Sequence, residues 1–264
     1  MILDDIVTRR RADLGKTRGM PERVLRRIIG SQPPARDFAG ALRRGGIQVI
    51  AEIKRASPVK GPLREELDPQ QFAQMYEARG AAAVSVLTEP HFFHGSLTDL
   101  CHARLACGLP VLRKDFIVDA FQILEARANE ADAVLLIAAV LDDRELAHLR
   151  AVAFSVGLEA LVEVHTREEA QRALDAGATV IGINNRNLYD FTVDLRTTEE
   201  IAGYLPHDVT LVSESGIRSA EDVYLLRQWG VHAILVGESL VTSPDPGTKL
   251  AELVSAGRFD RVAH

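Results

Sequence analysis

Acidic and basic residues stand at the ends of several short apolar segments in this 264-residue chain. Charged side chains are seldom buried for packing alone, so this placement indicates a functional site. If the segments are neighbouring parallel strands, lysines and glutamates converge and share protons, which suits general acid–base catalysis. A purely structural cluster of ion pairs is the alternative, and it would contribute little stability for its cost. The residues concerned are Glu52, Lys54, Lys114, Glu163, Asn184, Arg186, Glu214 and Ser215.

Two glycine-containing segments near the C-terminus indicate an anion site. They read Ser213-Glu214-Ser215-Gly216-Ile217 and Val236-Gly237-Glu238-Ser239-Leu240. Glycine lets backbone N–H groups approach an anion, and a helix N-terminus adds its dipole. Two tight turns that require glycine are the alternative. Because the segments would follow the last two strands of a barrel, where many barrels bind phosphate, we predict a phosphate site there.

The elements that must position these residues follow an alternating pattern of strand and helix. The strand candidates are nearly all apolar, as strands covered on both faces should be. Helical patterns lie between them, and several end at a glycine such as Gly80, Gly177 or Gly230. The predicted strands are Gln48–Lys54, Ala82–Leu87, Pro110–Lys114, Ala133–Ile137, Glu159–Glu163, Val180–Ile183, Thr210–Ser213 and Ala233–Val236. The predicted helices are Pro69–Arg79, Ala120–Asn129, Asp142–Val156, Arg167–Ala176, Ser219–Gln228 and Lys249–Ser255.

Eight such units predict an α/β fold, a closed (β/α)8 TIM barrel that occupies residues 1–264 as one domain. A doubly wound sheet is the alternative, but no strand is followed by GxGxxG or a P-loop. Residues 1–46 form a helical N-terminal extension, with helices expected at Asp4–Leu14, Pro21–Ile29 and Arg36–Arg44. This extension either plugs the bottom of the barrel or covers its active-site end, and the sequence favours neither.

Composition excludes several classes of function. The net charge of −6 does not favour nucleic acid or an anionic membrane, and no apolar run is long enough to span a bilayer. Cys101 and Cys107 match no metal or redox spacing, and the N-terminus is not a signal peptide, so we expect a cytoplasmic protein. His91 and His94 lack the partners of a metal site, and we expect none.

Further candidates surround these strand ends. The loop from Arg55 to Pro62 is basic and rich in hinge residues, so it is either a mobile lid or a plain surface loop. Phe93 and Phe116 either form the wall of a pocket for a ring-bearing substrate or belong to the core.

Six motifs, in order along the chain, resemble the indole-3-glycerol phosphate synthase family of tryptophan biosynthesis. The resemblance spans about residues 36–255. One departure lies in the first loop, where Val59 replaces the second serine of the family's Ser-Pro-Ser motif. The motifs are Ala51-Glu52-Ile53-Lys54-Arg55-Ala56-Ser57-Pro58, Ser85-Val86-Leu87-Thr88-Glu89, Arg113-Lys114-Asp115-Phe116-Ile117, Leu161-Val162-Glu163-Val164, Gly182-Ile183-Asn184-Asn185-Arg186-Asn187-Leu188 and Glu214-Ser215-Gly216-Ile217.

This resemblance implies a carboxy-lyase that needs no cofactor. The substrate would be 1-(o-carboxyphenylamino)-1-deoxyribulose 5-phosphate, closed to an indole with loss of carbon dioxide and water. The implied catalytic residues are Lys114, Lys54, Glu163, Glu52, Asn184 and Ser215. The implied substrate-binding residues are Ser57, Arg186, Phe93, Phe116, Leu135 and Leu188, and the phosphate would be bound at Gly216, Gly237 and Glu238.

Two rival functions remain open at this point. Another phosphosugar barrel, such as an isomerase or a Schiff-base aldolase, would use the same kinds of residue. A barrel without activity that binds aryl-ribulose phosphates or a partner protein is the second rival. The only expected partner is the small-molecule substrate, and a monomer is allowed, since the sequence is silent on oligomeric state.

Overall fold

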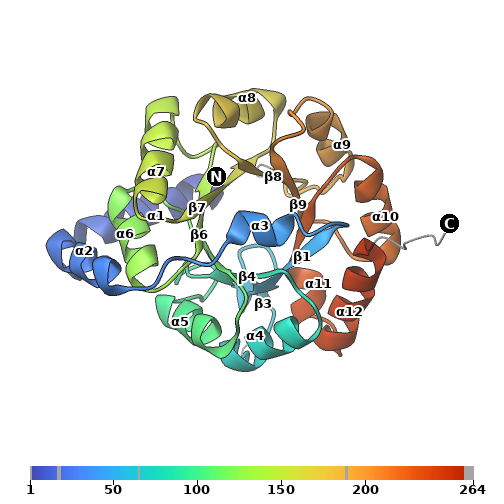
Figure 1. The fold of residues 1–264 in the computed structure, drawn as a ribbon, viewed down its shortest axis with the longest axis horizontal. Coiled ribbons are helices and arrows are strands. Elements are labelled where there is room, and N and C mark those ends of the chain that lie inside the picture. The colour runs from blue at the N-terminus through green and yellow to red at the C-terminus, as the bar shows by residue number, and fades with distance from the viewer. Residues whose placement is uncertain (1, 17–18, 65, 188–189, 259–264) are drawn as a thin grey trace.

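Eight parallel strands close into a barrel in a computed structural model that describes residues 2–16, 19–64, 66–187 and 190–258 (Figure 1). Going round the barrel, the order is β1-β10-β9-β8-β7-β6-β5-β4. Each predicted strand agrees with the observed one to within one residue at either end, so the predicted (β/α)8 barrel is confirmed. The barrel strands are β1 (Gln48–Ile53), β4 (Ala83–Leu87), β5 (Val111–Lys114), β6 (Ala133–Ile137), β7 (Glu159–Val164), β8 (Val180–Asn184), β9 (Thr210–Glu214) and β10 (Ala233–Val236).

The strands read as continuous apolar runs because both of their faces are covered. Inward side chains such as Leu112, Leu135 and Val212 fill the barrel interior. Outward side chains such as Val134 and Ile181 pack under the surrounding helices in a second, larger core. The two cores fix the register, since a slip of one residue would exchange the inward and outward faces.

Helices surround the barrel, and several of them start at capping residues. Asp119, Asp142 and Ser219 each form a capping box at the start of a helix. The outer helices are α4 (Pro69–Ala78), α5 (Leu97–Ala106), α6 (Ala120–Ala128), α7 (Asp143–Ser155), α8 (Arg167–Asp175), α9 (Arg196–Ala202), α10 (Ala220–Gln228), α11 (Glu238–Val241) and α12 (Pro246–Gly257). Within the described ranges, no helix has the length and apolarity needed to cross a membrane.

The N-terminal extension contributes three helices, α1 (Ile2–Lys16), α2 (Glu22–Ser31) and α3 (Phe38–Leu42). Helix α3 crosses the bottom of the barrel, in the centre of Figure 1, where Phe38 and Leu42 are buried among the inward side chains. Helix α2 packs on α6 through Leu25, Phe121 and Leu124. The extension therefore plugs the barrel floor with its last helix.

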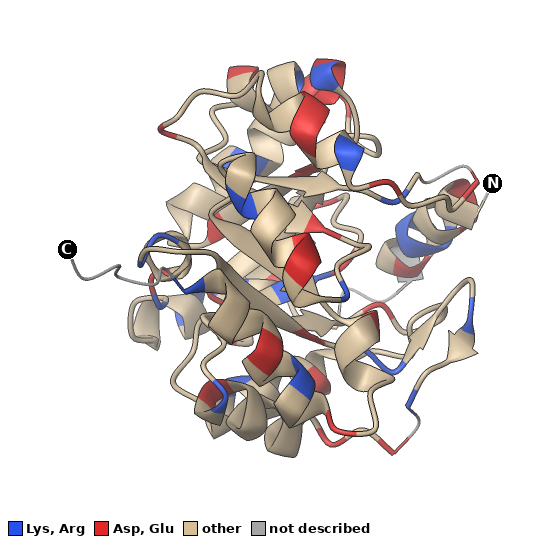
Figure 2. Cartoon of the chain, turned by 90° about the vertical axis from the view of Figure 1, so that its right-hand side faces the viewer, with Lys and Arg blue, Asp and Glu red and all other residues tan. Residues whose placement is uncertain are grey.

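Helix α1 lies at the opposite end of the barrel. Its side chains Ile2, Leu3 and Ile6 line the same pocket as Glu52 and Lys54. Figure 2 shows the helix beside the N mark at the end that also carries a small hairpin, β2 (Ala56–Ser57) and β3 (Gly61–Pro62), from the loop after β1. The two expected positions of the extension are thus both correct, each for a different helix.

Candidate active site

A pocket opens at the C-terminal ends of the barrel strands, and the charged residues of four strands meet in it. Lys114 is the central residue, because its Nζ lies 3.1 Å from Glu163 Oε2 and 3.3 Å from Glu214 Oε2. Lys54 Nζ lies 2.9 Å from Glu52 Oε1 on the same strand. The structure thus brings the predicted lysines and glutamates together at one mouth.

Burial and mutual charge set the protonation of this cluster. Burial lowers the pKa of Lys114, but Glu163, Glu214 and Glu52 outweigh it, so the pKa is raised and the ammonium persists. Burial raises the pKa of Glu163, yet Lys114 and His165 outweigh it and the pKa is lowered. Burial and the nearby Glu163 raise the pKa of Glu214 to about 7, against the opposing effect of Lys114. At rest the site therefore holds a charged lysine, an ionised carboxylate at Glu163 and a carboxyl at Glu214 whose pKa lies near neutrality.

Glu52 is held in place from several sides. Its Oε2 accepts a hydrogen bond from Ser85 Oγ at 3.3 Å, and its backbone carbonyl accepts one from Tyr76 Oη at 3.1 Å. Gly237 approaches it so closely that a Cβ there would lie 2.3 Å from Glu52 Oε1. A glycine is required at this position to leave room for the carboxylate that pairs with Lys54.

Asn184, Arg186 and Ser215 line the same pocket at the ends of β8 and β9. Asn184 Oδ1 accepts a hydrogen bond from the backbone N–H of Arg186 at 3.0 Å, which fixes the turn between them. Ser215, directly after β9, has a φ of 67°, a left-handed conformation that is uncommon for residues other than glycine. Asn185 stabilises this turn by donating to Ser213 Oγ at 2.9 Å and to the carbonyl oxygen of Ser215 at 3.1 Å.

An apolar wall faces the charged cluster. The rings of Phe93 and Phe116 lie 6.0 Å apart between centroids, and Leu135 lies beside them in the pocket lining. The rings therefore contribute to the pocket wall. Leu188, which was expected to bind substrate, lies outside the described residues.

The glycine segments form a second hollow that shares Lys54, Arg186 and Ser215 with the main pocket. Gly216 and Gly237 line it, as expected of an anion site. The carboxylate of Glu238 points to Lys60, at 2.6 Å, and lies 3.8 Å from Arg186. Ser57 lines the main pocket and its Oγ accepts from the backbone N–H of Lys60 at 3.2 Å. The loop after β1 is therefore tied across the pocket to the loop after β10.

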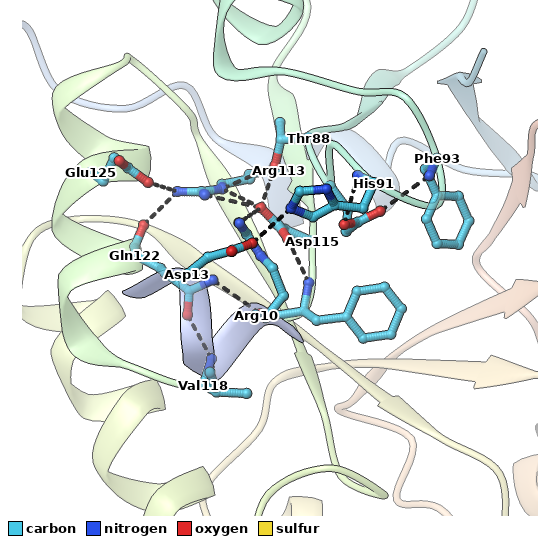
Figure 3. Close-up of polar contacts among 12 residues, drawn as sticks. Arg10, Asp13, Thr88, His91, Phe93, Arg113, Asp115, Val118, Gln122 and Glu125 are labelled. Carbon is cyan, nitrogen blue, oxygen red and sulfur yellow. Dashed lines mark hydrogen bonds and ion pairs between the residues drawn. The ribbon is translucent and has the colours of Figure 1, made fainter. Parts of the chain in front are cut away.

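A buried ion network connects the α1 helix to the strand that carries Lys114 (Figure 3). Arg10 Nη2 lies 2.6 Å from Asp115 Oδ2, the residue after Lys114. Arg113 Nη2 lies 2.9 Å from the same oxygen, and Thr88 Oγ1 donates to it at 2.6 Å. His91 Nε2 lies 2.8 Å from Asp13, also on α1. The cover helix is thus anchored next to the central lysine.

Comparison with known proteins agrees with this geometry. The family model described as "Indole-3-glycerol phosphate synthase" matches residues 3–253. The chain belongs to the indole-3-glycerol phosphate synthase family. A protein of that name from Roseiflexus sp. (strain RS-1) is 51% identical over 262 residues, covering 96% of this chain and 97% of the relative. One from Rhodococcus jostii (strain RHA1) is 49% identical over 257 residues, with 97% and 96% covered.

Solved structures outside the indole-3-glycerol phosphate synthase family share the fold. A thiamine phosphate pyrophosphorylase from Pyrococcus furiosus gives a TM-score of 0.62 at 18% identity, covering 81% of this chain and 96% of that chain. A putative lactate oxidase from Pediococcus acidilactici gives 0.61 at 16% identity, with 79% and 68% covered. At these identities the likeness shows the barrel and nothing about the chemistry.

Sequence reasoning missed several residues of the site. Ile2, Leu3 and Ile6 complete the pocket lining, and their apolar character alone did not place α1 at this end. His165 was also missed, although it follows Glu163 by two residues, directly after β7, and the alternation of side chains brings its ring beside that carboxylate. That period of two was the signal that would have found it. Among the described residues there is no group of three or more side chains arranged to bind a metal ion.

Proposed function

We propose that this chain catalyses indole-3-glycerol phosphate synthesis from 1-(o-carboxyphenylamino)-1-deoxyribulose 5-phosphate through general acid–base catalysis. The observation that carries the proposal is the position of the Lys114 ammonium, which is shared between two buried carboxylates of separate strands and faces an aromatic wall. Its reaction is that of a carboxy-lyase, as membership of the family implies.

The pocket matches the three parts of this substrate. Phe93, Phe116 and Leu135 offer an apolar surface for the carboxyphenyl ring. Gly216 and Gly237 line a hollow in which backbone N–H groups and Arg186 can donate hydrogen bonds to the phosphate oxygens. The ribulose then spans the space beside Lys54 and Lys114.

Lys114 is assigned as the acid of ring closure. Its ammonium protonates the ketone oxygen while the arene carbon that bears the carboxylate attacks the carbonyl carbon. Glu163, whose pKa is lowered, keeps Lys114 charged and oriented. Loss of carbon dioxide then returns an electron pair to the ring and restores its aromaticity.

Lys54 and the remaining carboxylates serve the dehydration. Lys54 either protonates the departing hydroxyl or holds the substrate carboxylate. Glu163 acts either as the base of the dehydration or as the proton partner of Lys54. Glu52 orients Lys54 at 2.9 Å. Asn184 and Ser215 orient the lysines and the sugar hydroxyls from the ends of β8 and β9. Ser57 contacts the substrate from the loop after β1, and Glu238 supports the phosphate hollow through its pairs with Lys60 and Arg186.

The raised pKa of Lys114 separates this reaction from its nearest rival. A Schiff-base aldolase needs a neutral amine as its nucleophile, which is obtained by lowering the pKa of a lysine. Here three carboxylates raise the pKa of Lys114, so the side chain is a proton donor and a poor nucleophile.

The test is indole fluorescence after mixing the protein with the carboxyphenylamino-deoxyribulose phosphate. The Lys114→Ala variant is expected to lower kcat by about 10³-fold, in the range for a lost general acid, with an unchanged circular dichroism spectrum. A folded variant that retains near-normal kcat would show that Lys114 is not the acid. Borohydride trapping of a lysine by the substrate would favour the aldolase.

A further inference from the structure

His165 is a buried histidine to which the mechanism above gives no task. Its ring lies between two carboxylates, with Nε2 3.5 Å from Glu163 Oε1 and Nδ1 3.2 Å from Glu169 Oε2. Nε2 is buried and has no hydrogen bond to any described residue. A movement of about half an ångström toward Glu163 would make a normal hydrogen bond.

This ring stands between two pockets. Glu163 faces the main pocket, whereas His165 and Glu169 face a second hollow, which we call the side pocket. Most of the residues that line the side pocket are polar, and we define it by His165, Thr166, Glu169, Asn187, Thr192 and Asp194. His165 therefore lies between Glu163 and the side pocket, which shares Leu3, Asn184 and Arg186 with the main pocket.

The proton balance of the proposed reaction gives such a route a task, and this inference rests on that proposed function. The arene–carboxylate bond breaks and the carboxylate leaves as carbon dioxide, taking no proton. The ketone oxygen gains two protons and leaves as water, while carbon 1 of the ribulose loses one proton. Each turnover therefore takes one net proton from solvent. With substrate bound beneath Ile2, Leu3 and Ile6 of the cover helix, the main pocket offers that proton a poor entry.

We propose that His165 is a relay that returns this proton to the active site. The imidazolium breaks its Nε2–H bond as an O–H bond forms on Glu163, which lies 3.1 Å from the lysine that was discharged. The neutral ring keeps its Nδ1–H, which stays bonded to Glu169 Oε2, and Nε2 takes a new proton from hydronium or a buffer acid that enters through the side pocket. No other reactant is needed, and the ring ends each cycle as it began.

The charges around the ring favour its protonated form. Burial lowers the pKa of His165, but Glu169 on α8, Glu163 on the preceding strand β7 and Glu214 on β9 outweigh it, so the pKa is raised. Lys114 opposes these carboxylates from the far side of Glu163. Asp4, Arg186 and Asp194 line the side pocket, where they complete the charged groups that surround the entry.

A merely structural role for the pair is the competing explanation. Glu169 Oε2 also accepts from the backbone N–H of His165 at 2.7 Å, and Thr166 Oγ1 accepts from the backbone N–H of Glu169 at 3.2 Å. These bonds cap the start of α8, but they do not require an imidazole against Glu163. The test must therefore separate the capping from the proton transfer.

The experiment compares His165→Ala, His165→Gln and Glu169→Gln by indole fluorescence, in steady state and in a single turnover. Glu168→Gln is the matched control, because Glu168 is an exposed glutamate in the same first turn of α8. For His165→Ala we expect kcat to fall roughly tenfold to 100-fold with KM within about twofold. The single-turnover rate should stay near that of the wild type, because the lysines begin charged. Glu169→Gln should lose part of kcat and Glu168→Gln none.

Imidazole rescue decides between a relay and a cap. Millimolar imidazole should restore kcat of His165→Ala to a plateau, without affecting the wild type or His165→Gln, whose side chain fills the space. A normal kcat in both His165 variants would overturn the relay. So would a loss that imidazole does not restore and that is equally large in a single turnover. If the wild type forms no indole at all, the proposed function fails and the relay fails with it.

Discussion

Replacing Arg10 by alanine tests whether the cover helix is anchored by the buried ion network. Arg10 Nη2 lies 2.6 Å from Asp115, which is fully buried, and the arginine side chain is only 11% exposed. The neighbouring Arg9 offers a matched control on the same helix. Its Nε lies 3.4 Å from Asp13, and its side chain is 56% exposed.

The expected magnitude follows from burial. A hydrogen bond to a charged group contributes about 1.5–3 kcal/mol, and the unpartnered buried Nε of Arg10 offsets part of it, leaving about 1–2 kcal/mol. Asp115 retains Arg113 and Thr88, so no bare charge is left behind. For Arg9→Ala we expect the free energy of opening of α1 to fall by at most about 0.5 kcal/mol. The opening equilibrium of α1 should therefore rise roughly tenfold in Arg10→Ala and by no more than about twofold in Arg9→Ala.

Native-state hydrogen exchange of peptides from residues 2–16 measures this opening directly. The pKa of Asp115 is lowered, against burial, by Arg113 and Arg10. A carboxyl group whose pKa is lowered by folding stabilises the fold at pH values above its ordinary pKa. This contribution is lost as the pH falls through the lowered pKa. The difference in hydrogen-exchange protection of α1 between the two variants should therefore be largest at pH 7 and become smaller in acid. Equal protection losses in Arg9→Ala and Arg10→Ala would refute the anchoring role.

Two further predictions concern the carboxylates of the site. Gly237→Ala should destabilise the protein by about 1–3 kcal/mol and lower kcat, because the new Cβ meets Glu52, which is too buried to move away. Gly30→Ala, where nothing lies within 4 Å of the new Cβ, is its control, and equal unfolding midpoints would contradict the prediction. The pKa of Glu214 is raised to about 7. Such a group stabilises the fold at pH values below the ordinary pKa of a glutamate, and this contribution is lost as the pH rises through 7. The stability of Glu214→Gln relative to the wild type should therefore improve by about 3 kcal/mol between pH 5 and pH 8, measured by urea unfolding, and a constant difference would count against the raised pKa.

The barrel was predictable because each strand is covered on both faces and therefore reads as an apolar run. Short helices were harder to predict. Helix α5 has apolar and polar residues mixed round its circumference, and α9 begins without a capping side chain. Nothing periodic marks either helix. The position of α1 was undecidable, because Ile6 is equally apolar on a floor or on a cover, and only its contacts distinguish the two.

The residues that make up the charged cluster could be predicted from the sequence. Strand ends such as those at Lys54 and Lys114 are fixed by the alternation of side chains, and parallel neighbours bring them together. What the sequence did not show is how charge is shared. The pairing of Lys114 with both Glu163 and Glu214, and the use of the Glu238 carboxylate to tie down Lys60, depend on side-chain directions in space.

The seam between β1 and β10 has a consequence for synthesis on the ribosome. Gln48 pairs with Ala233, and the backbone N–H of Ile47 donates to the carbonyl oxygen of Gly257 at 2.8 Å, so β1 gains its second neighbour only after residues 233–257 have been made. Until then one edge of β1 is open and liable to pair with other chains. Lys114 and Glu163 are translated well before Glu214, and their shared burial is completed only as the ring closes. In a nascent chain these charged side chains therefore stay exposed to water until β10 has been made. A chain that is truncated before β10 should be inactive and prone to aggregation.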